Sequence, residues 1–145
     1  MIITFTGQPN SGKTTLSQQL TEYLKLKGHT VNWIDGDNLR EMVKNFDYSE
    51  RGRKRNIETA YTIAKLYNRT TNYVVVSLVS PFKDLRESLK SDPSIITKEI
   101  YLHSSRFREG KMVSYYEPPT NNCLTIDTDK SNIPESLKLI IDYIS

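Results

Sequence analysis

A phosphate-binding pattern near the N-terminus constrains the fold of this 145-residue chain more than any other feature. An apolar run with Ile2 and Phe5 precedes the pattern, and leucines follow it at helical spacing. A glycine-rich turn between a strand and a helix lets successive N–H groups point at one phosphate, and the helix N-terminus adds partial positive charge. The sequence therefore predicts a nucleoside triphosphate as ligand. The pattern is G-x-x-x-x-G-K-[ST], matched by Gly7, Gln8, Pro9, Asn10, Ser11, Gly12, Lys13 and Thr14, with Thr15 directly after it.

Two side chains of this loop carry chemistry beyond that of its backbone. Lys13 adds a full positive charge beside the phosphates, and Thr14 offers its hydroxyl to Mg²⁺. We expect residues 7–15 to bind ATP with Mg²⁺, with Lys13 as a catalytic residue and Thr14 as a metal ligand. The alternative is a glycine-rich turn with an exposed lysine, which would not require a strand and a helix on its two sides.

Composition indicates one folded domain spanning residues 1–145. Apolar residues make up 37% of the chain and are concentrated in short runs, as in folded proteins. Twenty basic and seventeen acidic residues give a net charge of +3, which favours an anionic ligand without demanding a general nucleic-acid surface.

The only cysteine, Cys123, excludes an intrachain disulfide, and the longest apolar stretch, residues 73–79, is too short to cross a bilayer. The chain enters a strand without a basic leader, so we expect a cytoplasmic protein with no membrane partner.

Strand-like and helix-like segments alternate along the chain, which is typical of β-α-β units. We therefore predict a three-layer α/β fold of the P-loop NTPase type, with a parallel sheet of about five strands between helices. Residues 103–120 show neither period and are expected to form an irregular, lid-like segment. The predicted strands are 2–6, 30–35, 73–80, 99–102 and 123–127, and the predicted helices are 15–27, one through Ile57 and Ala64, 82–90, and a last one with Pro134 near its start and an apolar stripe of Leu137, Ile140, Ile141 and Ile144.

Acidic residues follow the second predicted strand, in the run Asp35-Gly36-Asp37-Asn38-Leu39-Arg40. Ligands of parallel sheets with helical crossovers gather at the carboxyl ends of the strands, so these side chains arrive where the phosphates should lie. One carboxylate, preferably that of Asp37, is expected to take a proton from an attacking hydroxyl or to hold Mg²⁺ through water. The alternative is an Asp-Gly turn that caps the next helix, with Asn38 or Asp37 as N-cap.

Two further segments carry groups suited to a second ligand. Tyr48 to Asn56 combines an aromatic ring and an amide with Arg51, Arg53, Lys54 and Arg55. The ring can stack on a base and arginines can pair with phosphate or sulfate, although such a charge run is also typical of a solvated face. Ser80-Pro81-Phe82 closes the third strand at the same edge of the sheet, where Phe82 is expected to be either a stacking wall or a core residue.

Taken together, these motifs resemble one family, the adenylylsulfate kinases, which are P-loop enzymes that move the γ-phosphoryl group of ATP to the ribose 3′-hydroxyl of adenosine 5′-phosphosulfate (adenylylsulfate). The resemblance spans nearly the full chain and is more specific than the P-loop alone. The matching residues are Gly7, Gly12, Lys13, Thr14 and Thr15; the run 35–40; Tyr48, Ser49, Arg53, Asn56 and Ile57; Ser80, Pro81, Phe82 and Arg86; Tyr116 to Pro119; and Leu124, Ile126, Asp127 and Thr128.

The resemblance implies a role for each site residue. Asp37 would be the base or the metal-linked carboxylate, and Tyr48 and Phe82 would sandwich the adenine of adenylylsulfate. Ser80 matches a serine that accepts phosphate transiently in some members, but we interpret it here as a strand-end hydroxyl that satisfies backbone groups. The substrate-binding residues predicted in this way are Asp35, Arg40, Tyr48, Arg53, Asn56, Ser80, Pro81 and Phe82.

The chain also departs from the family pattern. Members usually have Phe at position 48, Asp at position 52 and Glu at position 55, where this chain has Tyr48, Gly52 and Arg55. Members also carry an arginine-containing stretch and a lysine-rich lid helix between the equivalents of Leu102 and Tyr115, and this chain has only a short segment there.

A shortened lid has consequences for catalysis. Loss of a lid cation removes about 2–4 kcal/mol of transition-state stabilisation unless another cation replaces it. The candidate replacements are Arg106, Arg108 and Lys111. Because lid closure excludes water, a short lid predicts either ATP hydrolysis without acceptor or a larger acceptor that covers the site itself.

The sequence leaves three functions open. The first is phosphorylation of adenylylsulfate, and the second is phosphorylation of another hydroxyl, on a nucleoside or on a modified base within nucleic acid. The third is a nucleotide-binding regulator without turnover. Members of the family often pair as homodimers, and the sequence leaves the oligomeric state of this chain open.

Overall fold

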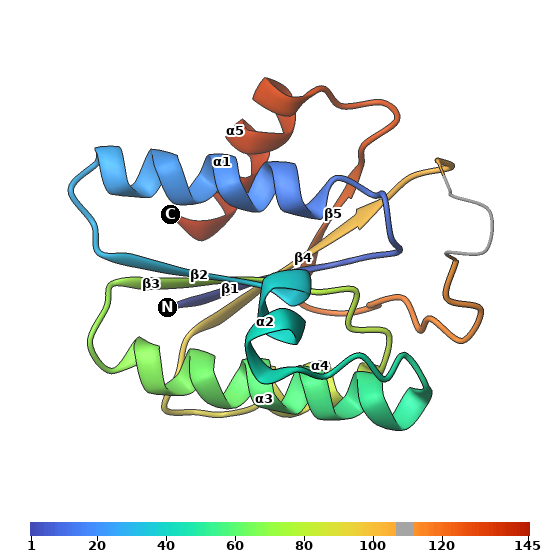
Figure 1. The fold of residues 1–145 in the computed structure, drawn as a ribbon. Helices are drawn as coiled ribbons and strands as arrows, with labels where there is room; N and C mark the ends of the chain where they lie inside the picture. The colour runs from blue at the N-terminus through green and yellow to red at the C-terminus, as the bar shows by residue number, and fades with distance from the viewer. Residues whose placement is uncertain (107–111) are drawn as a thin grey trace.

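The protein is described here from a computed structural model that places residues 1–106 and 112–145. Five parallel strands form one sheet in the order β2-β3-β1-β4-β5, with helices on both faces (Figure 1). The strands are β1 (Ile2–Thr6), β2 (Val31–Asp35), β3 (Tyr73–Ser77), β4 (Thr97–His103) and β5 (Cys123–Asp127), and the helices are α1 (Lys13–Leu26), α2 (Gly36–Val43), α3 (Glu50–Asn68), α4 (Lys83–Lys90) and α5 (Ile133–Ile144). The predicted α/β class and all five predicted strands are confirmed, two of them with the same bounds.

The central position of β1 follows from its composition. All five of its residues are buried, which suits a strand that pairs with β3 on one side and β4 on the other. The strand predicted over 73–80 ends at Ser77, although the Leu78 amide still donates to the Phe5 carbonyl oxygen at 3.2 Å and the Val79 carbonyl oxygen accepts from the Gly7 amide at 3.4 Å.

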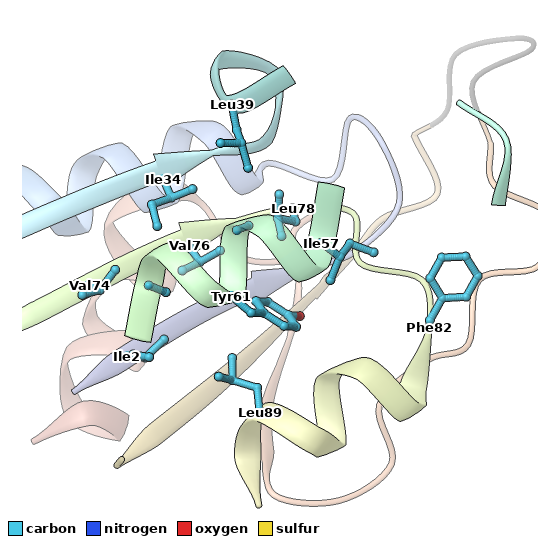
Figure 2. Close-up of a cluster of buried hydrophobic side chains, with 12 residues drawn as sticks. Ile2, Ile34, Leu39, Ile57, Tyr61, Val74, Val76, Leu78, Phe82 and Leu89 are labelled. Carbon is cyan, nitrogen blue, oxygen red and sulfur yellow. The ribbon is translucent and has the colours of Figure 1, made fainter. Parts of the chain in front are cut away.

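Two apolar layers hold the helices against the sheet. On one face, α3 and α4 cover a cluster that includes Ile2, Val74, Val76 and Leu89 (Figure 2). On the other face, α1 and α5 cover a cluster built on Phe5, Leu20, Ile100 and Ile140 (Figure 1). The predicted stripe of α5 is confirmed, since Ile140 and Ile144 are buried and Leu137 and Ile141 pack against them.

The start of α5 shows why the sequence folds in this way locally. Asn132 caps the helix through the amide of Glu135, the Glu135 side chain accepts from the Asn132 amide, and Pro134 lies in the first turn. None of the helices in the two described ranges is long and apolar enough to cross a membrane.

Candidate active site

The turn from β1 to α1 has the backbone geometry that the glycine pattern predicts. Gly7 adopts φ 153°, and a Cβ there would lie 2.3 Å from the Leu102 carbonyl oxygen. Gly12 adopts φ 101° and precedes α1 without a side-chain cap, and the first turn of α1 contains no acidic residue. The N-terminal amides of α1 are therefore left to a ligand, and the electrostatics of the turn favour an anion.

Lys13 is the charged group at this turn, and it is only 9% exposed. Its Nζ donates to the Gln8 carbonyl oxygen at 2.8 Å and to Ser11 Oγ at 3.4 Å. Burial lowers the pKa of Lys13 to about 8, against the opposing pull of the carboxylates of Asp37 and Asp35. Bound phosphate oxygens would raise this pKa again, because their negative charge favours the protonated amine.

Asp35 and Asp37 lie on the same cavity as Lys13. Asp35 ends β2 and is itself the N-cap of α2, because its Oδ2 accepts from the Asn38 amide at 3.4 Å. The alternative with Asn38 or Asp37 as N-cap is therefore wrong, and Asp37 is left in the first turn of α2 without a capping role. Burial raises the pKa of Asp35, whose Oδ1 accepts from Thr14 Oγ1 at 3.5 Å.

Arg40 and Tyr48 organise the loop between α2 and α3. Arg40 is 6% exposed, and its Nη1 donates to the carbonyl oxygens of Asn45 (3.0 Å) and Asp47 (3.1 Å). The Arg40 guanidinium lies 4.1 Å from the centre of the Tyr48 ring, and that of Arg53 lies 5.7 Å from it. One face of Tyr48 is thus occupied by Arg40, which acts first as an internal support of the loop.

Gly52 explains how this loop packs so closely on the first turn of α3. A Cβ at position 52 would lie 2.1 Å from the Asp47 carbonyl oxygen. The Gly52 amide donates to Ser49 Oγ, which caps α3, and the Gly52 carbonyl oxygen accepts from Asn45 Nδ2 at 3.0 Å. The glycine that departs from the family pattern is therefore required by the conformation of residues 45–49.

A single cavity of about 920 Å³ joins the phosphate-binding turn to this loop. Asn56 lies on the cavity and is 4% exposed, and its Oδ1 is buried with no hydrogen-bond partner among the residues that the structure describes. An unpaired buried acceptor on a cavity wall is costly unless a ligand donates to it. Of the predicted site residues, the cavity is lined by Pro9, Asn10, Gly12, Lys13, Thr14, Thr15, Asp35, Asp37, Arg40, Tyr48, Arg53, Asn56, Ser80 and Pro81.

Phe82 does not line this cavity. It is 6% exposed, stacks on Tyr115 at 5.6 Å between ring centres, and has Lys54 Nζ 4.9 Å from its ring centre. These three residues border a separate cavity of about 390 Å³. The arrangement supports the core interpretation of Phe82 and does not support a sandwich with Tyr48.

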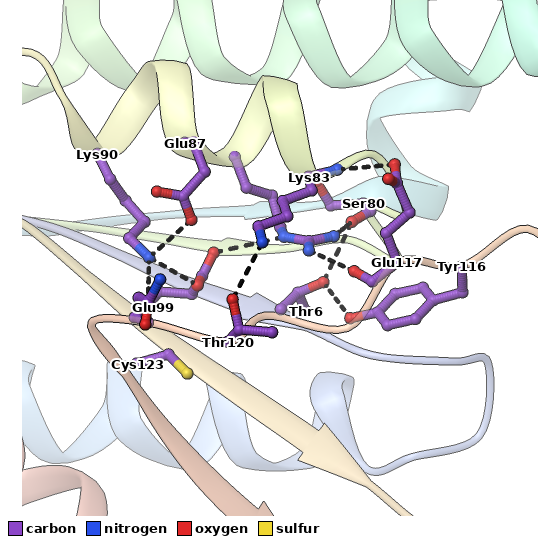
Figure 3. A network of polar contacts seen from close by, with 12 residues as sticks. Thr6, Ser80, Lys83, Glu87, Lys90, Glu99, Tyr116, Glu117, Thr120 and Cys123 are labelled. Atoms are coloured by element: carbon purple, nitrogen blue, oxygen red, sulfur yellow. Dashed lines mark hydrogen bonds and ion pairs between the residues drawn. The ribbon is translucent and has the colours of Figure 1, made fainter.

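Ser80 is buried, with a positive φ of 46°. Its hydroxyl lies 2.7 Å from the hydroxyl of Tyr61, whose pKa is raised by burial to about 12. The interpretation that the Ser80 hydroxyl satisfies backbone groups is wrong, because it pairs with a side chain. Its carbonyl oxygen accepts from Arg86 Nη1 at 2.6 Å and from Thr6 Oγ1, and this network supports the cavity wall (Figure 3).

Sequence reasoning missed several residues at the cavity. Glu41, Phe46 and Met112 line it as well, and no local motif marks them. Thr128 Oγ1 donates to the Ser11 carbonyl oxygen at 2.9 Å and so holds the phosphate-binding turn from β5. Thr128 belongs to the quoted motif 124–128, so that motif was the available signal.

Comparison with known families shows where the chain belongs. The family model of adenylylsulphate kinase matches residues 1–106, which is more than half of the chain. The chain belongs to the adenylylsulphate kinase family. The match covers the phosphate-binding turn, the acidic run and the α2–α3 loop, and it ends where the short connection departs from the family pattern.

Two curated relatives of this kinase family align with nearly the whole chain. The adenylyl-sulfate kinase of Staphylococcus epidermidis is 30% identical over 167 residues, covering 99% of this chain and 83% of the relative. The adenylyl-sulfate kinase of Halothermothrix orenii is 28% identical over 163 residues, covering 97% of this chain and 86% of the relative.

Solved structures give the same result. A solved structure of the Mycobacterium tuberculosis APS kinase, as a Cys556Ala mutant, superposes with a TM-score of 0.80 at 26% identity, covering 99% of this chain and 95% of that one. A second structure of that kinase, in complex with AMPPNP and APS, gives a TM-score of 0.82 at 24% identity, covering 99% and 96%, and supports the fold.

Three cations of this kinase are predicted to replace the lid cation of the family, and the structure describes one of them. Arg106 donates to Ser104 Oγ and, through Nη2, to Thr128 Oγ1 at 2.8 Å, and its Nε lies 3.6 Å from Asp129 Oδ1. It therefore lies beside the residue that holds the phosphate-binding turn. Arg108 and Lys111 fall outside the described residues.

Proposed function

We propose that this chain is an adenylylsulfate kinase that transfers the γ-phosphoryl group of ATP to the 3′-hydroxyl of adenosine 5′-phosphosulfate. One observation carries the proposal beyond family membership. The phosphate-binding turn and the aromatic, cationic and amide groups of the α2–α3 region line the same cavity. Donor and acceptor can therefore meet without a movement of the sheet.

On the donor side, the backbone of residues 7–15 and Lys13 hold the phosphates of ATP. Mg²⁺ fits here: Thr14 Oγ1 and Asp35 Oδ1 lie 3.5 Å apart on the cavity, and a carboxylate and a hydroxyl are suitable oxygen ligands. No group of three His, Cys, Asp or Glu side chains in the described residues forms a ready cluster, so phosphate oxygens and water would supply the other ligands. The ion would supply charge neutralisation at the transferred phosphoryl group.

We assign the base to Asp37 and the metal contact chiefly to Asp35. Asp35 is engaged with Thr14 and with the cap of α2, whereas Asp37 has no capping role and points its charge at the same cavity. In the transfer, the acceptor hydroxyl oxygen forms a bond to the γ-phosphorus, the bond to the ADP oxygen breaks, and Asp37 takes the hydroxyl proton.

On the acceptor side, three groups would recognise adenylylsulfate. The Tyr48 ring lines the cavity and can stack on adenine, and the side-chain amide of Asn56, which also lines the cavity, can hydrogen-bond to the edge of the base. Arg53 can pair with phosphate or sulfate oxygens, since it lines the cavity and its Nε, which donates to the Tyr48 carbonyl oxygen at 3.2 Å, leaves further N–H groups of the guanidinium for a ligand.

The test is a transfer assay with labelled ATP, Mg²⁺ and either adenylylsulfate, nucleosides or oligonucleotides. We expect label in the adenylylsulfate product only. Asp37→Asn should lower kcat by at least about 100-fold. Asp35→Asn, which retains a capping side chain, should mainly raise the Mg²⁺ concentration needed for half-maximal rate.

Asp142→Asn on the exposed face of α5 is the matched control and should behave like the wild type. Equal rates with all acceptors, or transfer only to oligonucleotides, would overturn the assignment of the acceptor. A reducing cytoplasm is the compartment that we propose for this reaction, because Cys123 is the only cysteine of the chain.

A further inference from the structure

Gln8 lies in the phosphate-binding turn, yet its side chain is directed to another part of the chain. Gln8 Nε2 donates to the Val113 carbonyl oxygen at 2.8 Å, and the Val113 amide donates to Gln8 Oε1 at 2.9 Å. Val113 is 4% exposed, so the two bonds are sheltered from water. A side-chain amide carries both a donor and an acceptor, which is what pairing with both groups of one peptide residue requires.

Val113 belongs to a short stretch, residues 112–117, that we call the returning segment. Tyr116 Oη lies 2.8 Å from Thr6 Oγ1 at the end of β1 (Figure 3), and the Glu117 amide donates to the Pro81 carbonyl oxygen at 2.9 Å. These contacts fix the later part of the returning segment against β1 and the end of β3. The paired bonds of Gln8 fix its earlier part, directly after Met112.

Met112 is the residue of the returning segment that lines the main cavity. Its side chain is 53% exposed, and within residues 1–106 and 112–145 no polar contact holds it, so its position depends on the backbone of its neighbour. Because Val113 is held at both its N–H and its C=O, the direction in which Met112 leaves the chain is set by Gln8. The returning segment thus borders the cavity directly after the part of the sequence that departs from the family pattern.

Gln8 also contacts the donor site through its main chain. Its carbonyl oxygen accepts from Lys13 Nζ at 2.8 Å. Phosphates that bind to Lys13 and to the amides of the turn restrict the Gln8 peptide, and the Gln8 side chain passes this restriction to Val113. One residue therefore joins Lys13 to the segment that borders the shared cavity.

We propose that Gln8 is a positioning residue that ties the returning segment to the phosphate-binding turn, so that Met112 borders the acceptor site while ATP is bound. The proposal rests on the proposed kinase function and deepens it. Gln8 does not touch either substrate with its side chain in this account. It acts through Val113 and Met112 on the acceptor and through its carbonyl oxygen on Lys13.

The variant Gln8→Leu tests the proposal, because it keeps the size of the side chain and removes both bonds. We expect the KM for adenylylsulfate to rise about tenfold, which is the loss expected from one to two hydrogen bonds. The dissociation constant for ADP should stay within about twofold, since the amides of the turn and Lys13 remain. The ratio of ATP hydrolysis to phosphoryl transfer should also rise, because the acceptor is held less firmly. Gln19→Leu, the same change on the exposed face of α1, is the matched control.

A second readout does not depend on the acceptor. Hydrogen exchange at the amides of Val113, Tyr116 and Glu117 should slow when ADP binds to the wild type and should not slow in Gln8→Leu. Should Gln8→Leu fail to fold, Gln8→Glu carries the same comparison, since it retains the acceptor for the Val113 amide and loses the donor.

An unchanged KM for adenylylsulfate together with wild-type protection of these amides by ADP would overturn the proposal and leave Gln8 with a purely structural role. If the wild type transfers nothing to adenylylsulfate, the proposed function fails. The exchange experiment then still decides the role of Gln8 by itself.

Discussion

Lys13 shows, at the scale of a single residue, how burial prepares a cation for a polyanion. Because burial lowers its pKa to about 8, the free protein loses this charge as pH rises through 8, while a bound phosphate keeps the amine protonated. We therefore predict that ATP affinity is constant below about pH 8 and falls up to about tenfold per pH unit above it. Calorimetric titration from pH 7 to 9.5 would show this. In Lys13→Met the affinity should be low and should not change over the same range, and an equally flat wild-type profile would contradict the prediction.

Gly52 gives a second prediction at this scale. Alanine is favoured over glycine within a helix by about 1 kcal/mol, so propensity alone predicts that Gly52→Ala stabilises α3. The Cβ would instead lie 2.1 Å from the Asp47 carbonyl oxygen and displace the loop that Arg40 and Tyr48 share. We expect a several-fold higher KM for adenylylsulfate, with ADP affinity unchanged, in steady-state kinetics and calorimetry. Glu58→Ala, on the exposed face of α3, is the control, and a more stable protein with unchanged KM would refute the account of this loop.

Among the secondary-structure elements, α4 and β4 are joined by buried charges. Glu99 on β4 is 1% exposed, with Lys90 Nζ 3.0 Å from its Oε1 and Arg86 Nε 3.6 Å from its Oε2 (Figure 3). Arg86 is 2% exposed and also donates to the carbonyl oxygens of Ser80 and Glu117. Helix α4 and strand β4 therefore support both the cavity wall at Ser80 and the end of the returning segment at Glu117.

Neutralising Glu99 would leave the Arg86 charge buried without its partner. We predict that Glu99→Gln lowers the free energy of unfolding by about 3–5 kcal/mol. Glu87→Gln removes a partner of the same Lys90 at 3.2 Å, but the Glu87 side chain is 42% exposed, so the change should cost less than about 1 kcal/mol. Urea unfolding at pH 7 measures both variants. Similar losses of unfolding free energy in the two variants would contradict the prediction that the buried ion pair contributes more to stability.

The elements were largely predictable from the sequence, since buried runs such as Ile2–Thr6 and the spacing of α5 are local signals. The phosphate-binding turn was predictable for the same reason. Contacts between residues far apart in the chain were not: Gln8 and Val113 are 105 residues apart, and Thr6 and Tyr116 are 110 apart. Phe82 was ambiguous because an aromatic side chain after a strand fits a core and a binding site equally well, and its stacking on Tyr115 in the structure supports the core interpretation.

At the scale of the whole molecule, the sheet brings donor and acceptor groups to one edge, and the connection after β4 is short. The phosphate-binding turn follows β1, the acidic run follows β2 and Ser80 follows β3, and all of them border the same cavity. In this arrangement, the described residues can position the reactants and balance the charge that phosphoryl transfer develops.

The most direct test of this account is phosphoryl transfer from labelled ATP to adenylylsulfate by the intact chain, followed by identification of the labelled product. The account predicts ADP formation that saturates with adenylylsulfate, a label on the 3′-oxygen, and loss of this product in Asp37→Asn. A label that never reaches adenylylsulfate, or that reaches it undiminished in Asp37→Asn, would contradict the central claim.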